Sequence, residues 1–169
     1  ENAEKKYILP LLGREMYDEI NAFYKADFPA EPTDPEKDMK ELLLKTQHAL
    51  IHLAYFIGFD FLNVQVTDSG FQRVESDRTK GLFHYQEQNL KKYFSDSGFN
   101  GLDDVLVFLE DNIRHFREFE ESENYTVLKT SFLPTVKDTE AIPFNLNGSR
   151  LLFLALRPMV AYVEDMQIR

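Results

Sequence analysis

Residues 35–64 constrain the fold more than any other part of the sequence, because hydrophobic residues recur there at helical spacing. In the first half, residues such as Leu43 and Leu50 share one face and the opposite face is polar. In the second half the formerly polar face also becomes apolar, through residues such as Tyr55 and Phe59. A helix that is apolar all round is surrounded by protein. The sequence therefore predicts a central helix, about 45 Å long at 1.5 Å per residue, that enters the core as it proceeds.

The other helical segments are expected to pack around this helix. A short N-terminal helix is followed by a bend at Pro10 to Gly13, because proline lacks a helix donor and glycine loosens the backbone. The run 95–98, Ser-Asp-Ser-Gly, predicts the end of one helix, and Asn100 with Asp103 resembles a capping box that begins the next. The remaining predicted helices cover residues 14–24, 82–94, 100 onwards, 125–132 and 150–166.

Ser149 is expected to cap the last helix at its N-terminus. The apolar positions of two helices are expected to face the core. They are Phe83, Leu90 and Phe94 in the helix at 82–94, and Leu152, Leu156, Met159, Val163 and Met166 in the last helix.

After residue 64 the period of the hydrophobic pattern changes from helical to alternating, which predicts a small β-hairpin at 64–74. A lone hairpin is marginal in water, so it must pack on a helix or pair with a third strand, for which the alternating residues 142–146 are the candidate. The expected fold is mainly α, with about five to six helices around the central helix at about 35–64. The hairpin and the third short strand complete a single domain, residues 1–169.

The composition excludes several functional classes. The 169 residues include no cysteine, which removes disulfides, thiolate nucleophiles and cysteine-held metal clusters. The 19 Lys and Arg against 29 Asp and Glu give a net charge of −10, which argues against tight nucleic-acid binding. The sequence has no phosphate-binding glycine loop and no Gly-x-Ser-x-Gly motif. The longest apolar stretch, 49–62, is shorter than the roughly 20 residues of a membrane helix. We therefore expect no membrane insertion, no cofactor and no enzymatic activity.

His48 and His52 form the sharpest constellation of chemically active side chains. Histidines at positions i and i+4 share one helical face and could both reach one metal ion. The glutamate of the zinc-protease motif His-Glu-x-x-His is missing, so a third ligand would have to come from elsewhere. A polar edge on a half-buried helix explains the same pattern. We therefore expect no metal site, and keep a metal-binding or hydrolytic protein using this pair as an alternative function.

The aromatic content leaves another alternative open, a small-molecule or peptide-binding helical module. The chain has 15 Phe and 8 Tyr, and a subset of them could line a cavity. Aromatic residues at helical spacing usually form core, and phenylalanine lacks a polar group with which to orient a ligand. This alternative requires a cavity of several hundred Å³, the size typical of ligand sites.

Three short motifs, in this order, resemble those of a family of uncharacterised proteins from Bacteroidetes genomes and their phages and prophages. They are YILPLLGREMYD at 7–18, VTDSGF at 66–71, and FNLNGSRLLFLALRPM at 144–159 followed by VED at 163–165. The resemblance extends over residues 7–168. The helical plan with one hairpin is also similar to that of the head–tail connector adaptors of tailed phages, which assemble as rings.

This resemblance implies a non-enzymatic structural or assembly protein of phage or prophage origin, connector-like, in the cytoplasm or the virion. Its expected partners are its own copies and neighbouring phage structural proteins. An acidic ring would let DNA slide without sticking, so the net charge is compatible with this role. Long irregular segments are often functional, so the expected interface lies in the segment 124–141 and at the hairpin tip. The candidate residues are Asp68, Ser69, Gly70, Tyr125 and Phe132.

Overall fold

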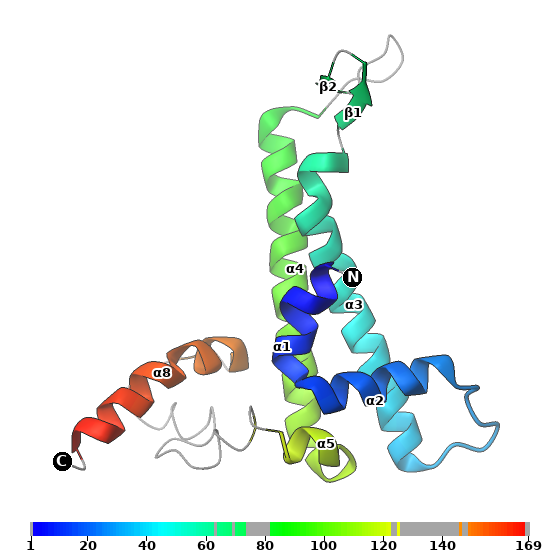
Figure 1. Ribbon diagram of the computed structural model, residues 1–169, viewed down its shortest axis with the longest axis vertical. Helices are drawn as coiled ribbons and strands as arrows, with labels where there is room; N and C mark the ends of the chain where they lie inside the picture. The colour runs from blue at the N-terminus through cyan, green and yellow to red at the C-terminus, as the bar shows by residue number, and fades with distance from the viewer. Residues whose placement is uncertain are drawn as a thin grey trace.

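The computed structural model describes residues 2–62, 64–68, 70–73, 82–122, 125, 146 and 149–167. These residues are mainly helical, as predicted. Two long helices, α3 (Asp34–Leu62) and α4 (His84–Asp111), run side by side in opposite directions (Figure 1). We call this pair the stalk. Shorter helices gather around its lower half and form the base (Figure 1).

The N-terminal helices of the base bend where the sequence predicts. A π-helix, η1 (Glu4–Ile8), continues into α1 (Leu9–Leu12), and α2 (Arg14–Lys25) follows directly. Gly13 separates α1 from α2 with φ of 81°. Glycine populates positive φ readily because it has no Cβ atom, so the chain can turn here without strain. The turn lays α2 across α3 (Figure 1).

The core lies where the base meets the lower stalk. The second half of α4 supplies Leu102, Val105, Leu106 and Leu109, which are buried in one cluster with residues of α3 and the N-terminal helices. Two short helices, η2 (Ile113–His115) and α5 (Arg117–Glu120), close the bottom of the base. The core residues with the lowest exposure are Ile8, Leu12, Met16, Leu42, Ala49, Leu53, Val105, Leu109 and Phe116.

The predicted helix end at 95–98 is wrong, because α4 runs through it without a break. Gly98 and Gly101 are buried against α3. A Cβ atom on Gly98 would lie 2.7 Å from the side chain of Leu53. The glycines therefore permit close approach of the two helices, and this packing outweighs their low helix propensity.

The prediction that the second half of α3 enters the core is also wrong. Among the described residues, α4 is the main packing partner of α3, and it buries Leu53 and Phe59 but leaves much of the outer surface of this half exposed (Figure 1). Phe61 is 74% exposed, and Tyr55 and Leu62 are exposed as well. Of the residues expected to face inward from 82–94, Phe83 is 69% exposed and Leu90 is also exposed. The apolar pattern was real, but the helices that the structure describes do not cover it.

The last helix, α8 (Arg150–Gln167), is anchored to α4 at its first turn. Ser149 is its cap, as predicted, and its Oγ accepts a hydrogen bond from the Leu152 N–H at 3.2 Å. Asp103 does not form the predicted capping box. Its Oδ1 instead accepts the Arg150 N–H at 2.6 Å and the Leu151 N–H at 2.9 Å. One carboxylate and one hydroxyl group thus accept hydrogen bonds from three backbone N–H groups that the first turn of a helix leaves without partners.

The predicted inward stripe of α8 points largely to solvent. Met159 is 68% exposed and Met166 is 63% exposed, and Leu152 and Val163 are exposed with them. The opposite side of the helix packs instead, with Phe153 buried against Leu146. The alternating pattern at 142–146 predicted a strand, and one of its apolar residues, Leu146, is buried against this helix. The other residues of that predicted strand lie outside the described residues.

The prediction that a β-hairpin packs into the domain is not supported. Two short strands, β1 (Val64–Thr67) and β2 (Gly70–Arg73), pair antiparallel with Val64 opposite Arg73. They stand beyond the upper ends of α3 and α4 rather than against a helix or a third strand (Figure 1). In the part of the chain that the structure describes, no helix is long and apolar enough to cross a membrane.

Candidate functional site

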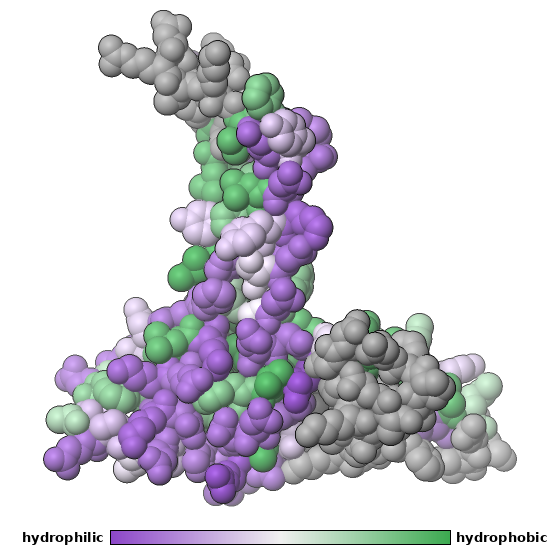
Figure 2. Space-filling model, turned by 180° about the vertical axis from the view of Figure 1, so that it is seen from behind, coloured by the Kyte–Doolittle hydropathy of each residue, from purple (hydrophilic) through white to green (hydrophobic). Residues whose placement is uncertain are grey.

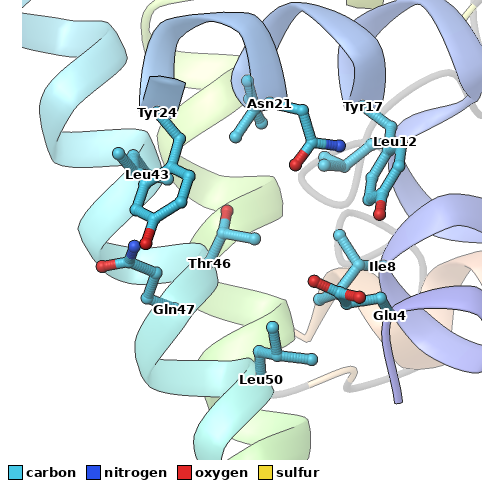
Figure 3. A pocket seen from close by; sticks show the side chains of 11 residues that line it. Glu4, Ile8, Leu12, Tyr17, Asn21, Tyr24, Leu43, Thr46, Gln47 and Leu50 are labelled. Carbon is cyan, nitrogen blue, oxygen red and sulfur yellow. The ribbon is translucent and has the colours of Figure 1, made fainter. Parts of the chain in front are cut away.

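A pocket of about 240 Å³ lies between the N-terminal helices and α3 (Figure 3). Its apolar walls come from the four helices η1, α1, α2 and α3, and they consist of Ile8, Leu12, Ile20, Leu43 and Leu50. Its polar lining comes from η1, α2 and α3, and consists of Glu4, Tyr17, Asn21, Tyr24, Thr46 and Gln47. The bend at Gly13 creates this enclosure, because it turns α2 across α3 while η1 runs beside α3.

The polar side chains of this pocket converge on its centre (Figure 3). Asn21 points down from α2, Thr46 points up from α3, and the Glu4 carboxylate enters from η1. A mostly apolar pocket with a few convergent polar groups is the usual form of a small-ligand site. The arrangement therefore offers both an apolar surface and hydrogen-bonding groups to one small molecule.

Thr46 is the most unusual of these residues. It is 6% exposed, and its buried Oγ1 has no hydrogen-bond partner. Helical threonines commonly satisfy this hydroxyl on the carbonyl of the preceding turn, and a buried hydroxyl without a partner costs free energy. Because Thr46 lines the pocket, a bound ligand is the group that would satisfy it.

A second polar feature of the base is the carboxyl pair Glu19 and Glu118, which joins α2 to α5. Burial raises the pKa of Glu19 from 4.5 to about 7, and the hydrogen bond and charge repulsion from Glu118 act in the same direction. The Oε2 atom of Glu19 is buried without a partner. A raised pKa lets one proton be shared between the two carboxyl groups near neutral pH.

His48 and His52 lie together on α3, with ring centroids 4.5 Å apart. The Nδ1 atom of His52 is 2.8 Å from the His48 carbonyl oxygen, so this nitrogen donates to the backbone and only Nε2 remains for another partner. Among the described residues, no group of three His, Cys, Asp or Glu side chains could hold a metal ion. The His52 ring also contacts the rings of Tyr93 and Phe94 on α4. The expectation of no metal site at this pair, and the metal-binding alternative, both stay untested.

Comparison with known proteins identifies a family for most of the chain. Residues 8–129 match the model of a family of unknown function, DUF6712. The chain belongs to the DUF6712 family. No curated protein and no solved structure matches the chain. The DUF6712 match includes α2, α3, α4 and α5, and thus every pocket residue except Glu4, while α8 lies beyond it.

The interface residues predicted from the sequence are not brought together by the described part of this DUF6712 protein. Asp68 is exposed in the turn between the two strands, where the backbone of Gly70 begins β2. Tyr125 is half-buried and its ring packs 5.4 Å from that of Phe119. Ser69 and Phe132 lie outside the described residues. The predicted interface at these positions stays a prediction.

Sequence reasoning missed the pocket residues Glu4, Asn21 and Thr46. A signal for Thr46 was present, because it lies on the same face of the central helix as Leu42, Leu43, Leu50 and Leu53. A single hydroxyl in an apolar stripe is a candidate for contact with a ligand. For Glu4 and Asn21 the signal was absent, since their approach to Thr46 depends on the Gly13 bend.

Proposed function

We propose that this DUF6712 protein is a non-enzymatic assembly protein that binds its own copies and neighbouring structural proteins of a phage or prophage particle. The observation that carries the proposal is the exposed apolar stripe of α8. The helix is fixed to α4 by its first turn, yet Leu152, Met159, Tyr162, Val163 and Met166 are exposed. A continuous apolar stripe of this kind marks a protein–protein contact.

A second apolar surface lies on the stalk. A groove of about 450 Å³ runs over α3 above the N-terminus, and its lining consists of Asn2, Ala3, Leu50, Ile51, Ala54, Ile57 and Gly58. Hydrophobic residues also gather along one side of the upper stalk in the space-filling view, while the other side is hydrophilic (Figure 2). The α8 stripe runs away from the stalk, so within one chain it does not cover this groove (Figure 1).

Two different apolar surfaces on one chain favour a head-to-tail contact between copies, in which α8 of one copy binds the α3 groove of the next. Such heterologous contacts form a ring when the rotation between copies closes, and a filament when it does not. A ring agrees with the connector-like role that the sequence resemblance implies. The net charge of −10 agrees with a channel wall that repels DNA.

Light scattering coupled to size-exclusion chromatography over a concentration series tests self-association. The wild-type chain should form species larger than a monomer as the concentration rises. Met159→Glu on the α8 stripe and Ile51→Glu in the groove should each remain monomeric, because a charge would be buried in the contact. Ala161→Glu is the matched control, since it adds the same charge to an exposed position of α8 off the stripe, and it should assemble like the wild type.

A mixture of the two monomeric variants separates the head-to-tail contact from a symmetric one. Met159→Glu keeps its groove and Ile51→Glu keeps its α8 stripe, so the mixture should form a dimer and nothing larger. A wild-type chain that stays monomeric at every concentration would contradict the proposal. Particles from an induced host should carry the protein, as detected by antibody labelling in electron micrographs, and unlabelled particles would contradict the phage role.

A further inference from the structure

We propose that the pocket between η1, α2 and α3 is a binding site for a compact alkylammonium ion. The ion would place its positive head between Glu4, Asn21 and Thr46 and its alkyl chain against the apolar walls. This inference is independent of the proposed assembly role, because it requires no contact between copies.

The polar groups of the pocket favour a ligand that donates hydrogen bonds. The Glu4 carboxylate only accepts them, and the Asn21 carboxamide oxygen and the Thr46 hydroxyl oxygen accept them as well. An ammonium group carries three donors and no acceptor, so it can donate to three such oxygens at once.

The charge of the site favours a cation over a neutral donor. Glu4 is the only carboxyl group in the described lining, which contains no Lys, Arg or His. The whole chain adds a net charge of −10, which draws cations towards the protein and repels anions. Hydrogen bonds to ionised groups are shorter and stronger than neutral ones, so the carboxylate would dominate recognition of the head group.

The size and walls of the pocket limit the ligand. A volume of about 240 Å³ corresponds to about eight water molecules at ~30 Å³ each, which leaves room for a molecule of up to about that many heavy atoms. Ile8, Leu43 and Leu50 line the remainder of the space and would bury a short alkyl chain. Two sources share this chemistry, a free small amine and the lysine side chain of a partner protein.

The unsatisfied hydroxyl of Thr46 distinguishes this pocket from a simple packing gap. Thr46 is more than nine-tenths buried, and its Oγ1 has no partner although its side chain points into the space (Figure 3). Buried polar groups in folded proteins nearly always have a hydrogen-bond partner. A ligand donor at this position would supply it.

Amide chemical-shift titration of the full chain with n-butylammonium chloride tests the proposal. The shifts of η1, α2 and the middle of α3 should saturate with a Kd of about 1 mM, as expected for so small a ligand. Sodium chloride at the same ionic strength controls for salt. The neutral analogue 1-butanol has the same number of heavy atoms without the charge, and it should bind at least about tenfold more weakly.

Two substitutions identify the site. Glu4→Gln should weaken n-butylammonium binding about tenfold, because the carboxamide oxygen still accepts a hydrogen bond but carries no negative charge. Thr46→Val should weaken it about fivefold through the loss of one hydrogen-bond acceptor. Glu15→Gln removes a carboxylate from an exposed position of the same base, and it should leave the affinity unchanged. Substitution of buried Thr46 could perturb packing. Glu4 is only partly buried, so Glu4→Gln tests the site without that complication.

A second probe, Nα-acetyl-lysine N-methylamide, distinguishes the two sources. Binding equal to or tighter than that of n-butylammonium, with the same amides shifted, assigns the head group to a lysine side chain of a partner. Binding at least tenfold weaker assigns it to a free amine. The proposal is overturned by shifts that do not saturate, by equal affinity for 1-butanol and n-butylammonium, or by an equal loss of affinity in Glu15→Gln and Glu4→Gln.

Discussion

Gly101 of α4 lies so close to Ala49 of α3 that a Cβ atom on the glycine would be 2.9 Å from the Cβ atom of the alanine and 3.0 Å from its Cα atom. Real Cβ contacts are longer than this, so no other residue fits at position 101 without movement of a helix backbone. Gly98, one turn earlier, faces Leu53 in the same way. The close approach of α3 and α4 thus depends on two small residues at helical spacing.

Gly101→Ala should therefore destabilise the protein. The added methyl group meets the backbone of α3, and overpacking of this kind costs about 1–3 kcal/mol. Gly58→Ala is the matched control, because Gly58 is also helical and nothing lies within 4 Å of its added Cβ atom. It should raise the free energy of unfolding by up to about 1 kcal/mol through helix propensity. Urea denaturation of both variants measures the difference, and equal effects would contradict the close-packing interpretation.

The same glycines show what the sequence could and could not predict. Local propensity at 95–98 predicts a helix end, whereas the contact that overrides it lies almost fifty positions away, at Ala49 and Leu53. The α3 and α8 periodicities correctly predicted helices. A period identifies an apolar face but does not reveal whether the chain has enough helices to cover it, as the exposure of Phe61 and Met159 shows. The pocket could not be predicted from the sequence either, because it forms only when the chain changes direction at Gly13.

Asp103 should determine how firmly α8 is held. Its carboxylate accepts two backbone N–H groups of the first turn of α8, at Arg150 and Leu151, and the ion pair of Arg150 with Glu110 reinforces the same junction at 2.5 Å. Asp103→Ala removes a helix cap, a change that costs about 0.5–2 kcal/mol. Hydrogen exchange of the α8 amides should accelerate by about tenfold or more, while exchange in α3 changes much less.

Asp104→Ala is the control for this cap, because Asp104 is exposed on the neighbouring position of α4. It should leave the exchange of the α8 amides close to that of the wild type. Equal acceleration by both substitutions would mean that general loss of acidic charge on α4, rather than the cap, controls α8.

The carboxyl pair Glu19 and Glu118 should make stability depend on pH. The pKa of Glu19 is about 7 in the folded state and near 4.5 when the chain unfolds, so the folded state holds a proton that the unfolded state has released. The contribution of the pair is fully present below about pH 4.5 and is lost as the pH rises through about 7. Because Glu19 is only partly buried, the effect should be about 1 kcal/mol.

Glu19→Gln should remove this dependence, because the carboxamide stays neutral and can donate to Glu118 at every pH. Urea denaturation should show the variant more stable than the wild type by about 1 kcal/mol near pH 8 and closely similar near pH 4.5. Glu15→Gln on the exposed side of the same helix should shift stability by the same amount at both pH values. A Glu19→Gln difference that does not change with pH would show that the pair is ionised throughout.

Thr46→Val should stabilise the ligand-free protein, the reverse of its expected effect on amine binding. Valine has nearly the shape of threonine, and the change removes a buried hydroxyl that has no hydrogen-bond partner. The expected gain is about 1 kcal/mol, or about 3 °C in Tm for a chain of this length. Thr33→Val is the control, since the Thr33 hydroxyl does have a partner and donates to Glu36 at 2.7 Å at the start of α3. Calorimetry should therefore show opposite signs for the two substitutions. A loss of stability in both would mean that the Thr46 hydroxyl is already satisfied in the folded protein, which would also remove the reason for a ligand to bind beside it.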